Sequence, residues 1–171
     1  MQSELRSRAW LVVVCFALTL AYGLLLAFAF EPDVQEIDVA ELVDRRGDAR
    51  AFLIADLFFP LLYGLLSPIA QLRFGAALGG RGGPDESRPP RWIIAAALLL
   101  AGAGLFDLTE NVLLLSATGS ESQGTVDTAH AVAVPKVILF VAGALLALLV
   151  LARAISVLRR GPRPTSRRSK S

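Results

Sequence analysis

Two carboxylates and a carboxamide interrupt an otherwise apolar stretch at 106–115, FDLTENVLLL. Asp107, Glu110 and Asn111 are spaced i, i+3 and i+4, so they share one face of a helix. Carboxylates bind cations or act as general acids and bases, and an amide can orient a substrate through hydrogen bonds. This short stretch therefore predicts a polar site on one face of a helix.

Two other apolar segments each carry one isolated ionisable residue. Asp56 begins DLFFPLLYG at 56–64, and Pro60 and Tyr63 follow it at i+4 and i+7 on the same helix face. Lys136 lies early in the last apolar segment. Because Pro60 has no N–H, the carbonyl of Asp56 loses its helical hydrogen bond. The position then offers a carboxylate and a free carbonyl oxygen, which suit a hard cation or a hydrogen-bond donor.

The elements that hold these residues are predicted to be membrane helices. The 171 residues are 54% hydrophobic, which is more apolar than an ordinary soluble domain. Four apolar runs each reach the roughly 20 residues that cross a bilayer as a helix. They cover residues 9–30, 51–72, 92–117 and 131–157. The predicted fold is an all-α integral membrane four-helix bundle, with no length left for a separate soluble catalytic domain.

The first run also has features of a signal peptide. Arg6 and Arg8 precede it, and Ala27-Phe28-Ala29 at its end resembles a cleavage site. The run is longer than the roughly 7–15 apolar residues of a typical signal sequence. We therefore expect it to be retained as a membrane anchor, with cleavage as the alternative.

The arginines predict the orientation in the membrane. The N-terminus, the 73–91 connection and the 158–171 tail carry most of them, whereas the 116–130 connection has no Lys or Arg. The 31–50 connection has three Arg against seven acids. Because loops rich in Lys and Arg stay in the cytoplasm, both termini are predicted to be cytoplasmic, in a plasma membrane.

The connections suggest different structures and partners. The acidic 31–50 loop predicts a short amphipathic helix on the outer surface, with a solvated linker as the alternative. The Gly/Pro-rich 73–91 loop is expected to be irregular. The basic 158–171 tail is expected to be disordered near anionic lipid, and without aromatic residues it gives no support for a nucleic-acid partner. The expected partners are the lipid bilayer and either a membrane protein or a second copy of the chain.

The polar residues are predicted to lie at one depth. Counted from the predicted outer helix ends at 1.5 Å per residue, Asp56, the 107–111 group and Lys136 all lie on the order of 10 Å below the surface. A charge facing lipid would cost roughly 2.5–3.5 kcal/mol, so these side chains should point into the bundle. We therefore predict one internal polar site in the outer half of the membrane.

The charges of this site do not balance. Lys136 can neutralise one carboxylate, and a site of low dielectric does not hold two further negative charges. Protonation, a divalent cation or a positively charged substrate would restore the balance. The candidate metal ligands are Asp56, Asp107, Glu110 and His130. For His130, a surface residue near the membrane interface is the alternative interpretation.

These motifs resemble those of a family of small bacterial four-helix membrane proteins. The pattern of that family is D-x-x-F-P-x-x-Y in the second helix and D-x-x-E-N in the third. The residues that match it are Asp56, Phe59, Pro60, Tyr63, Asp107, Glu110 and Asn111. The resemblance covers the second to fourth helices and implies that this polar set recurs in related proteins. It implies no particular activity.

One candidate function is an intramembrane site that binds or acts on a lipid or small amphiphile at the outer leaflet. The candidate catalytic residues are Asp56, Asp107, Glu110 and Lys136, and the candidate substrate-orienting residues are Tyr63 and Asn111. The chain contains no H-E-x-x-H or G-x-S-x-G motif and only one His, which argues against a zinc or serine hydrolase.

Two other functions stay open. In a non-enzymatic subunit or scaffold, Lys136 would pair with Asp107 or Glu110 to hold helices together. If Pro135 began the last helix, Lys136 would instead reach outward to the headgroups. An ion or proton pathway would need an oligomer, because no polar residues are expected at a matching depth in the cytoplasmic half. A pocket that opens from the cluster, with a carboxylate left unpaired, would distinguish a site from a scaffold.

Overall fold

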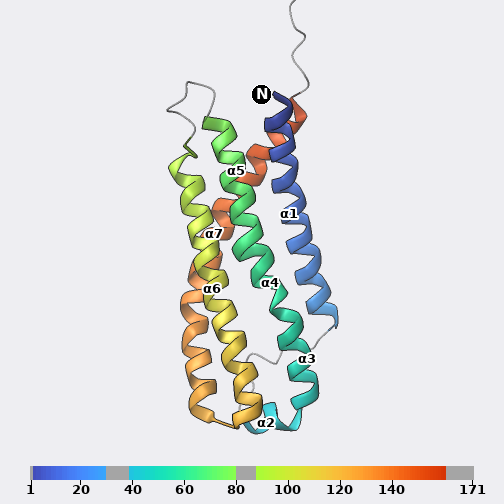
Figure 1. Cartoon of the computed structure of the whole chain (residues 1–171), viewed down its shortest axis with the longest axis vertical. Coiled ribbons are helices and arrows are strands. Elements are labelled where there is room, and N and C mark those ends of the chain that lie inside the picture. Colours follow the sequence, from blue (N-terminus) through green and yellow to red (C-terminus); the bar gives the residue numbers. More distant parts are fainter. Residues whose placement is uncertain (1, 30–38, 80–87, 161–171) are drawn as a thin grey trace, which may run out of the picture.

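Four long helices lie side by side along the molecule (Figure 1). The computed structural model describes residues 2–29, 39–79 and 88–160. The four helices are α1 (Gln2–Ala29), a second helix over Arg46–Gly79, α6 (Arg91–Ser120) and α7 (Gln123–Arg159). Each is long and apolar enough to cross a bilayer. The prediction of an all-α, four-helix membrane protein is confirmed.

Several predictions about the connections fall outside the described residues. These are the first part of the acidic loop, eight residues of the Gly/Pro-rich loop and nearly all of the basic tail, at 30–38, 80–87 and 161–171. The start of the Gly/Pro-rich loop, residues 73–79, was expected to be irregular but is helical. In the remainder of the acidic loop the chain forms a short helix, α2 (Val39–Asp44), before the second long helix begins at Arg46.

The two ends of the bundle differ in their connections. At one end, the α2 end, lie α2 and the turn between α6 and α7; at the other, the terminal end, α1 begins and α7 ends (Figure 1). Glu121 closes α6 with a left-handed φ of 54°, and its N–H donates to the carbonyl of Ala117 over 2.9 Å. Arg46 forms an ion pair with Glu121, so the start of the second helix is tied to this turn.

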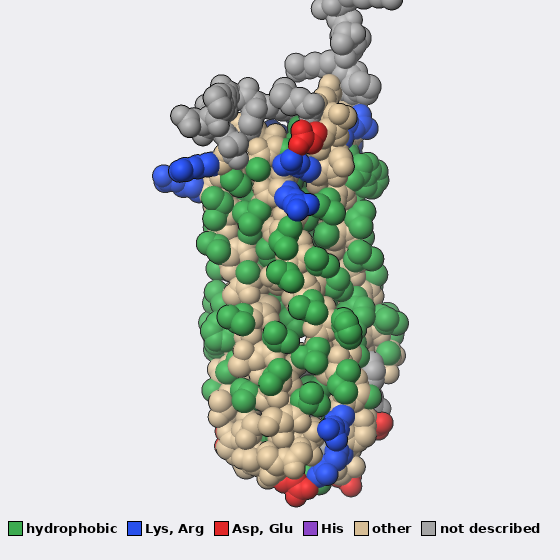
Figure 2. All heavy atoms as spheres, in the orientation of Figure 1, with side chains coloured by type: hydrophobic (Ala, Val, Ile, Leu, Met, Phe, Trp, Pro, Cys, Tyr) green, Lys and Arg blue, Asp and Glu red, His purple; other side chains and the backbone are tan. Residues whose placement is uncertain are grey.

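Apolar side chains cover the middle of the molecular surface. On the face shown in Figure 2, charged side chains gather at the two ends, and the band between them carries apolar side chains. Phe28, Leu98 and Leu105 are 86%, 68% and 66% exposed. A continuous apolar band of this kind is the surface that contacts the acyl chains of a lipid bilayer.

Three apolar clusters fill the interior. The cluster at the terminal end joins α1 to the other three long helices around Phe74, and the cluster at the α2 end surrounds Leu53. The middle cluster contains Tyr63 and Leu100. Helix α1 contributes buried residues to the terminal cluster alone, and toward the α2 end it diverges from α7 (Figure 1). Helix α1 therefore contributes to the apolar clusters at the terminal end of the bundle and not further along.

The second helix is irregular where it passes the middle of the bundle. Its segments are α3 (Arg46–Asp56), α4 (Phe58–Leu61), one π-helical turn η2 (Leu62–Leu66) and α5 (Ser67–Gly79). Pro60 explains the break after Asp56, because it has no N–H to donate to the carbonyl of Asp56. Single π-helical turns are frequent at functional sites. The break was implied by the sequence, whereas the π-helical turn was not predicted.

The second helix and α6 touch through their backbones. A Cβ atom added to Gly64 would lie 2.7 Å from the Cα of Gly104, and one added to Gly104 would lie 3.2 Å from the carbonyl oxygen of Pro60. Small residues let membrane helices approach this closely. The contact holds the second helix against α6 at the level where both carry their polar residues.

The closeness of this contact predicts the effect of a single methyl group. Gly104→Ala should destabilise the protein by about 1–3 kcal/mol, because the backbone of Gly64 occupies the space that the methyl needs. On the same helix, Gly119→Ala places its Cβ where nothing lies within 4 Å and should raise the stability by about 0.5–1 kcal/mol. Unfolding of both variants in detergent, followed by circular dichroism, measures the difference. Equal stabilities would mean that the helices do not touch here.

Candidate binding site inside the bundle

Six polar side chains from three helices meet at one level inside the bundle, and we call them the polar network. They are Asp56, Tyr63, Asp107, Glu110, Asn111 and Lys136. Five of them are between 1% and 5% exposed, and the side chain of Lys136 is 12% exposed. The network consists of the six residues that the sequence predicted to meet.

Lys136 bonds to two carboxylates of α6. Its Nζ lies 3.2 Å from Oδ1 of Asp107 and also forms an ion pair with Oε2 of Glu110. Because the two acids are three residues apart on one helix, a single ammonium group from α7 reaches both. The interpretation in which Pro135 begins the last helix is wrong, since α7 begins at Gln123 and Pro135 lies in its interior. Lys136 therefore points into the bundle.

The second helix joins the network through two hydrogen bonds. Nδ2 of Asn111 donates to Oδ2 of Asp56 over 2.8 Å, and the hydroxyl of Tyr63 donates to Oδ2 of Asp107 over 2.9 Å. Both oxygens of Asp107 are thus bonded. Among the described residues, Asn111 is the one side chain that donates to Asp56, and it uses one of the two oxygens. Asp56 is therefore the least compensated acid of the network.

The network has more acids than bases. Its three carboxylates and one ammonium group leave a formal charge of −2 when all four are ionised. In the part of the chain that the structure describes, no second Lys or Arg is bonded to these acids. An interior of low dielectric does not hold such an excess, so protons or a bound cation must balance it.

A pocket of about 180 Å³ opens beside the network. It is lined by Asp56, Phe59, Tyr63, Asp107, Lys136, Val137 and Phe140. A single water needs roughly 10–15 Å³ of such space, so the pocket has room for several waters. Val137 is 54% exposed on the apolar surface of α7, so the pocket borders the surface that faces lipid.

Aromatic rings form the walls of this pocket. The ring of Tyr63 lies 5.0 Å from the ring of Phe59 and 5.0 Å from that of Phe140, with interplanar angles of 59° and 79°. Aromatic faces beside carboxylates attract organic cations. Neither phenylalanine was predicted to line the site. Their positions could have been predicted from the spacing. Phe59 follows Asp56 at i+3 and Phe140 follows Lys136 at i+4, so each lies on the same helix face as a residue of the network.

Three of the candidate metal ligands belong to the polar network, but the fourth, His130, does not, and the described residues form no metal-binding group. His130 does not line the pocket, and its Nε2 is buried without a hydrogen-bond partner among the described residues. Within residues 2–29, 39–79 and 88–160, no three His, Cys, Asp or Glu side chains are placed to hold a metal ion. Lys136 occupies the position between Asp107 and Glu110 that a cation would take.

A further buried polar pair lies on the second helix nearer the terminal end. Nε2 of Gln71 donates to Oγ of Ser67 over 3.1 Å, and the two residues are 2% and 8% exposed. No polar residues were expected at a matching depth in the predicted cytoplasmic half, but this pair is buried in the half of the bundle nearer the terminal end. The pair continues the helix face of Tyr63 at i+4 and i+8, which was visible in the sequence. Within the described structure no hydrogen bond joins it to the polar network, so it does not extend that network across the membrane.

Comparison with known proteins identifies no family for this chain. No family model, no curated protein and no solved structure matches it. The four apolar helices establish a four-helix membrane protein, and membership of the family that the motifs resemble stays a prediction.

Removing the ammonium group of Lys136 should lower the stability of the protein, because the buried acids then lack a counter-charge. Lys136→Met should destabilise the protein by about 3–5 kcal/mol at neutral pH, because Asp107 and Glu110 lose their counter-charge. The control Glu121→Gln breaks an exposed ion pair and should cost at most about 1 kcal/mol. Unfolding in detergent compares the two.

The pH dependence of the stability of Lys136→Met tests the same prediction in a second way. Acidification should restore part of the stability that Lys136→Met loses, because protonation removes the uncompensated negative charge. A Lys136→Met variant as stable as the unmodified protein at neutral pH would show that the ion pairs contribute little to the fold.

Proposed function

We propose that the protein binds the positively charged headgroup of a lipid or small amphiphile, which enters from the bilayer. The observation that carries this proposal is the pocket beside the polar network, which is lined by both acids and aromatic rings. The residues concerned are Asp56, Asp107, Phe59, Tyr63 and Phe140. Carboxylates and aromatic faces together are the groups that recognise ammonium ligands.

Asp56 is the proposed counter-ion of this headgroup. It lines the pocket and has one carboxylate oxygen that no described side chain bonds. A bound ammonium group would also offset the excess negative charge of the network. The alkyl part of the ligand would lie outside the pocket, along the apolar surface near Val137.

The other members of the network hold the pocket in shape. Glu110 and Asn111 do not line it, and they position Lys136 and Asp56 through their bonds. Tyr63 bonds to Asp107 and forms one aromatic wall. If the bound headgroup is also chemically changed, Asp56 is the carboxylate placed to take or give a proton.

A scaffold function is the second candidate, and one observation favours it. Each bond of the polar network joins two different long helices, so the network holds the bundle together. A scaffold does not require a pocket at the network or an acid with one free oxygen. These two features support binding over a purely structural role.

Binding of a cationic amphiphile tests the proposal. In an uncharged detergent, dodecyltrimethylammonium should bind to the protein, and dodecyl sulfate, with the same alkyl chain and opposite charge, should not compete. Asp56→Asn should weaken binding about tenfold or more, because it removes the charge of the counter-ion. Isothermal titration calorimetry measures each affinity.

The matched control for this experiment is Asp48→Asn. It removes an exposed carboxylate from the same helix and should leave the affinity within about twofold. Equal binding of the cation by the unmodified protein and by Asp56→Asn would contradict the proposal. If the unmodified protein binds no cation and Asp56→Asn fails to fold, the scaffold function is the better account.

We also propose that the α2 end faces outward, which puts the pocket in the outer half of the membrane. The support is the excess of arginine in the segments at the terminal end. In a Cys15→Ser background, an impermeant maleimide should label Gln123→Cys in intact cells and Arg160→Cys only after permeabilisation. The reverse pattern would place the pocket in the inner half.

A further inference from the structure

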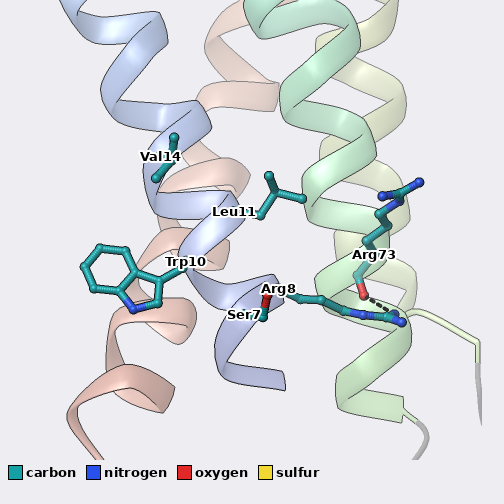
Figure 3. Close-up of a pocket in the computed structure, with 6 residues that line it drawn as sticks. All are labelled: Ser7, Arg8, Trp10, Leu11, Val14 and Arg73. Carbon is teal, nitrogen blue, oxygen red and sulfur yellow. Dashed lines mark hydrogen bonds between the residues drawn. The ribbon is translucent and has the colours of Figure 1, made fainter. Parts of the chain in front are cut away.

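A second pocket lies toward the terminal end of the bundle, between α1 and α5 (Figure 3). Its volume is about 630 Å³, and it is lined by Ser7, Arg8, Trp10, Leu11, Val14 and Arg73. None of these residues belongs to the polar network or lines the first pocket. The first pocket is lined by two acids and one lysine, whereas this one is lined by two arginines and no acid.

Arg8 spans the gap between the two helices. Its Nη1 donates to the backbone carbonyl of Arg73 over 3.0 Å, as Figure 3 shows, and its Nη2 pairs with Glu4 on the preceding turn of α1. A guanidinium group has five N–H donors, and these two bonds leave others free. The guanidinium of Arg73 is bonded to no carboxylate among the described residues. The pocket therefore has positively charged guanidinium N–H groups that are not used in hydrogen bonds between described residues.

The charges around the pocket suit an anion of single charge. Arg8, Arg73 and the neighbouring Glu4 sum to a formal charge of +1. A phosphodiester carries one negative charge, and guanidinium groups bind its oxygens through paired hydrogen bonds. The charge of the pocket thus matches a phosphodiester more closely than a phosphomonoester of higher charge.

The rest of the lining is apolar and faces the bilayer. Trp10, Leu11 and Val14 are 56%, 38% and 46% exposed on α1, a helix long and apolar enough to span the membrane. Leu11 and Val14 lie one and two turns beyond Ser7, so the lining changes from polar to apolar along the helix axis. Tryptophan is the residue enriched at the boundary between headgroups and acyl chains. The lining thus changes from polar to apolar in the same order as a phospholipid changes from its phosphate to its acyl chains.

We propose that this pocket is a binding site for one anionic phospholipid, whose phosphodiester is held by Arg8 and Arg73. Its glycerol region lies against Trp10, and its acyl chains follow Leu11 and Val14. A lipid fits better than free phosphate because half of the lining is apolar and open to the bilayer. Basic pockets between membrane helices are typical sites for anionic headgroups.

Lipid exchange on the full chain tests this assignment. The protein in uncharged detergent is titrated with phosphatidylglycerol or phosphatidylcholine, and the bound lipid is counted by native mass spectrometry. Phosphatidylglycerol should bind at least tenfold more tightly than phosphatidylcholine. The double variant Arg8→Gln/Arg73→Gln should lose about tenfold or more of this affinity, because both guanidinium groups are gone.

The control double variant removes the same charge from the same end of the bundle. Arg153→Gln/Arg159→Gln changes two exposed arginines of α7 that do not line the pocket, and it should keep its affinity within about twofold. An equal loss in both double variants would show general attraction to basic charge and would overturn the site. Displacement of the bound lipid by millimolar inorganic phosphate would overturn the choice of a lipid.

A variant that is expected to bind the lipid more tightly gives a test whose result a folding defect cannot explain. Glu4→Gln removes the carboxylate that shares Arg8, so it should raise the affinity for phosphatidylglycerol several-fold. An unchanged or lower affinity in a folded Glu4→Gln variant would contradict the proposed charge balance. Asp56→Asn, at the other pocket, should bind phosphatidylglycerol as the unmodified protein does.

Discussion

A buried carboxylate in a membrane bundle has no water to stabilise it, so its partners must come from neighbouring helices. In this protein three such acids lie in a network with one ammonium group, which bonds two of them, and that constraint organises the middle of the structure. Lys136 of α7 bonds to the two acids of α6, and Asn111 reaches across to Asp56 on the second helix. These bonds fix the positions of the three helices relative to one another along the axis of the bundle. The excess of negative charge that remains is what makes the network a candidate for binding a cation as well as a structural element.

The path of the second helix makes this arrangement possible. Pro60 interrupts its hydrogen bonding after Asp56, and Tyr63, which donates to Asp107, lies within the π-helical turn that follows. At Gly64 the helix then rests directly on the backbone of α6. A regular helix with a larger residue at this point would stand further from α6 and would not bring its carboxylate within hydrogen-bond distance of an amide there. Local irregularity and close packing thus act together.

The position of α1 separates the bundle into two regions with different chemistry. At the terminal end α1 packs into the core, and its arginine and tryptophan form a basic pocket with α5. Further along it diverges from α7, and the acidic pocket lies where α1 contributes no lining residue (Figure 1). Both pockets border apolar surface and both pair charge with aromatic groups, but their charges are opposite. The two proposals thus assign oppositely charged membrane amphiphiles to the two pockets.

The sequence by itself determined the four apolar helices, because length and hydropathy alone decide which segments can cross a bilayer. It also determined that Asp107, Glu110 and Asn111 share a face and that Asp56 and Lys136 must turn inward, because exposure of their charges to lipid is costly. Only the tertiary structure decided which bonds form: Lys136 bonds two acids, Asp56 has one oxygen that no described side chain bonds, and Phe140 lines the pocket. It also decided that Pro135 lies inside its helix and that His130 stays apart from the network. The physical reason is that helix periodicity fixes the direction of a side chain on its own helix, whereas its partner depends on how closely neighbouring helices approach, here through a glycine contact whose place in the bundle no local pattern shows.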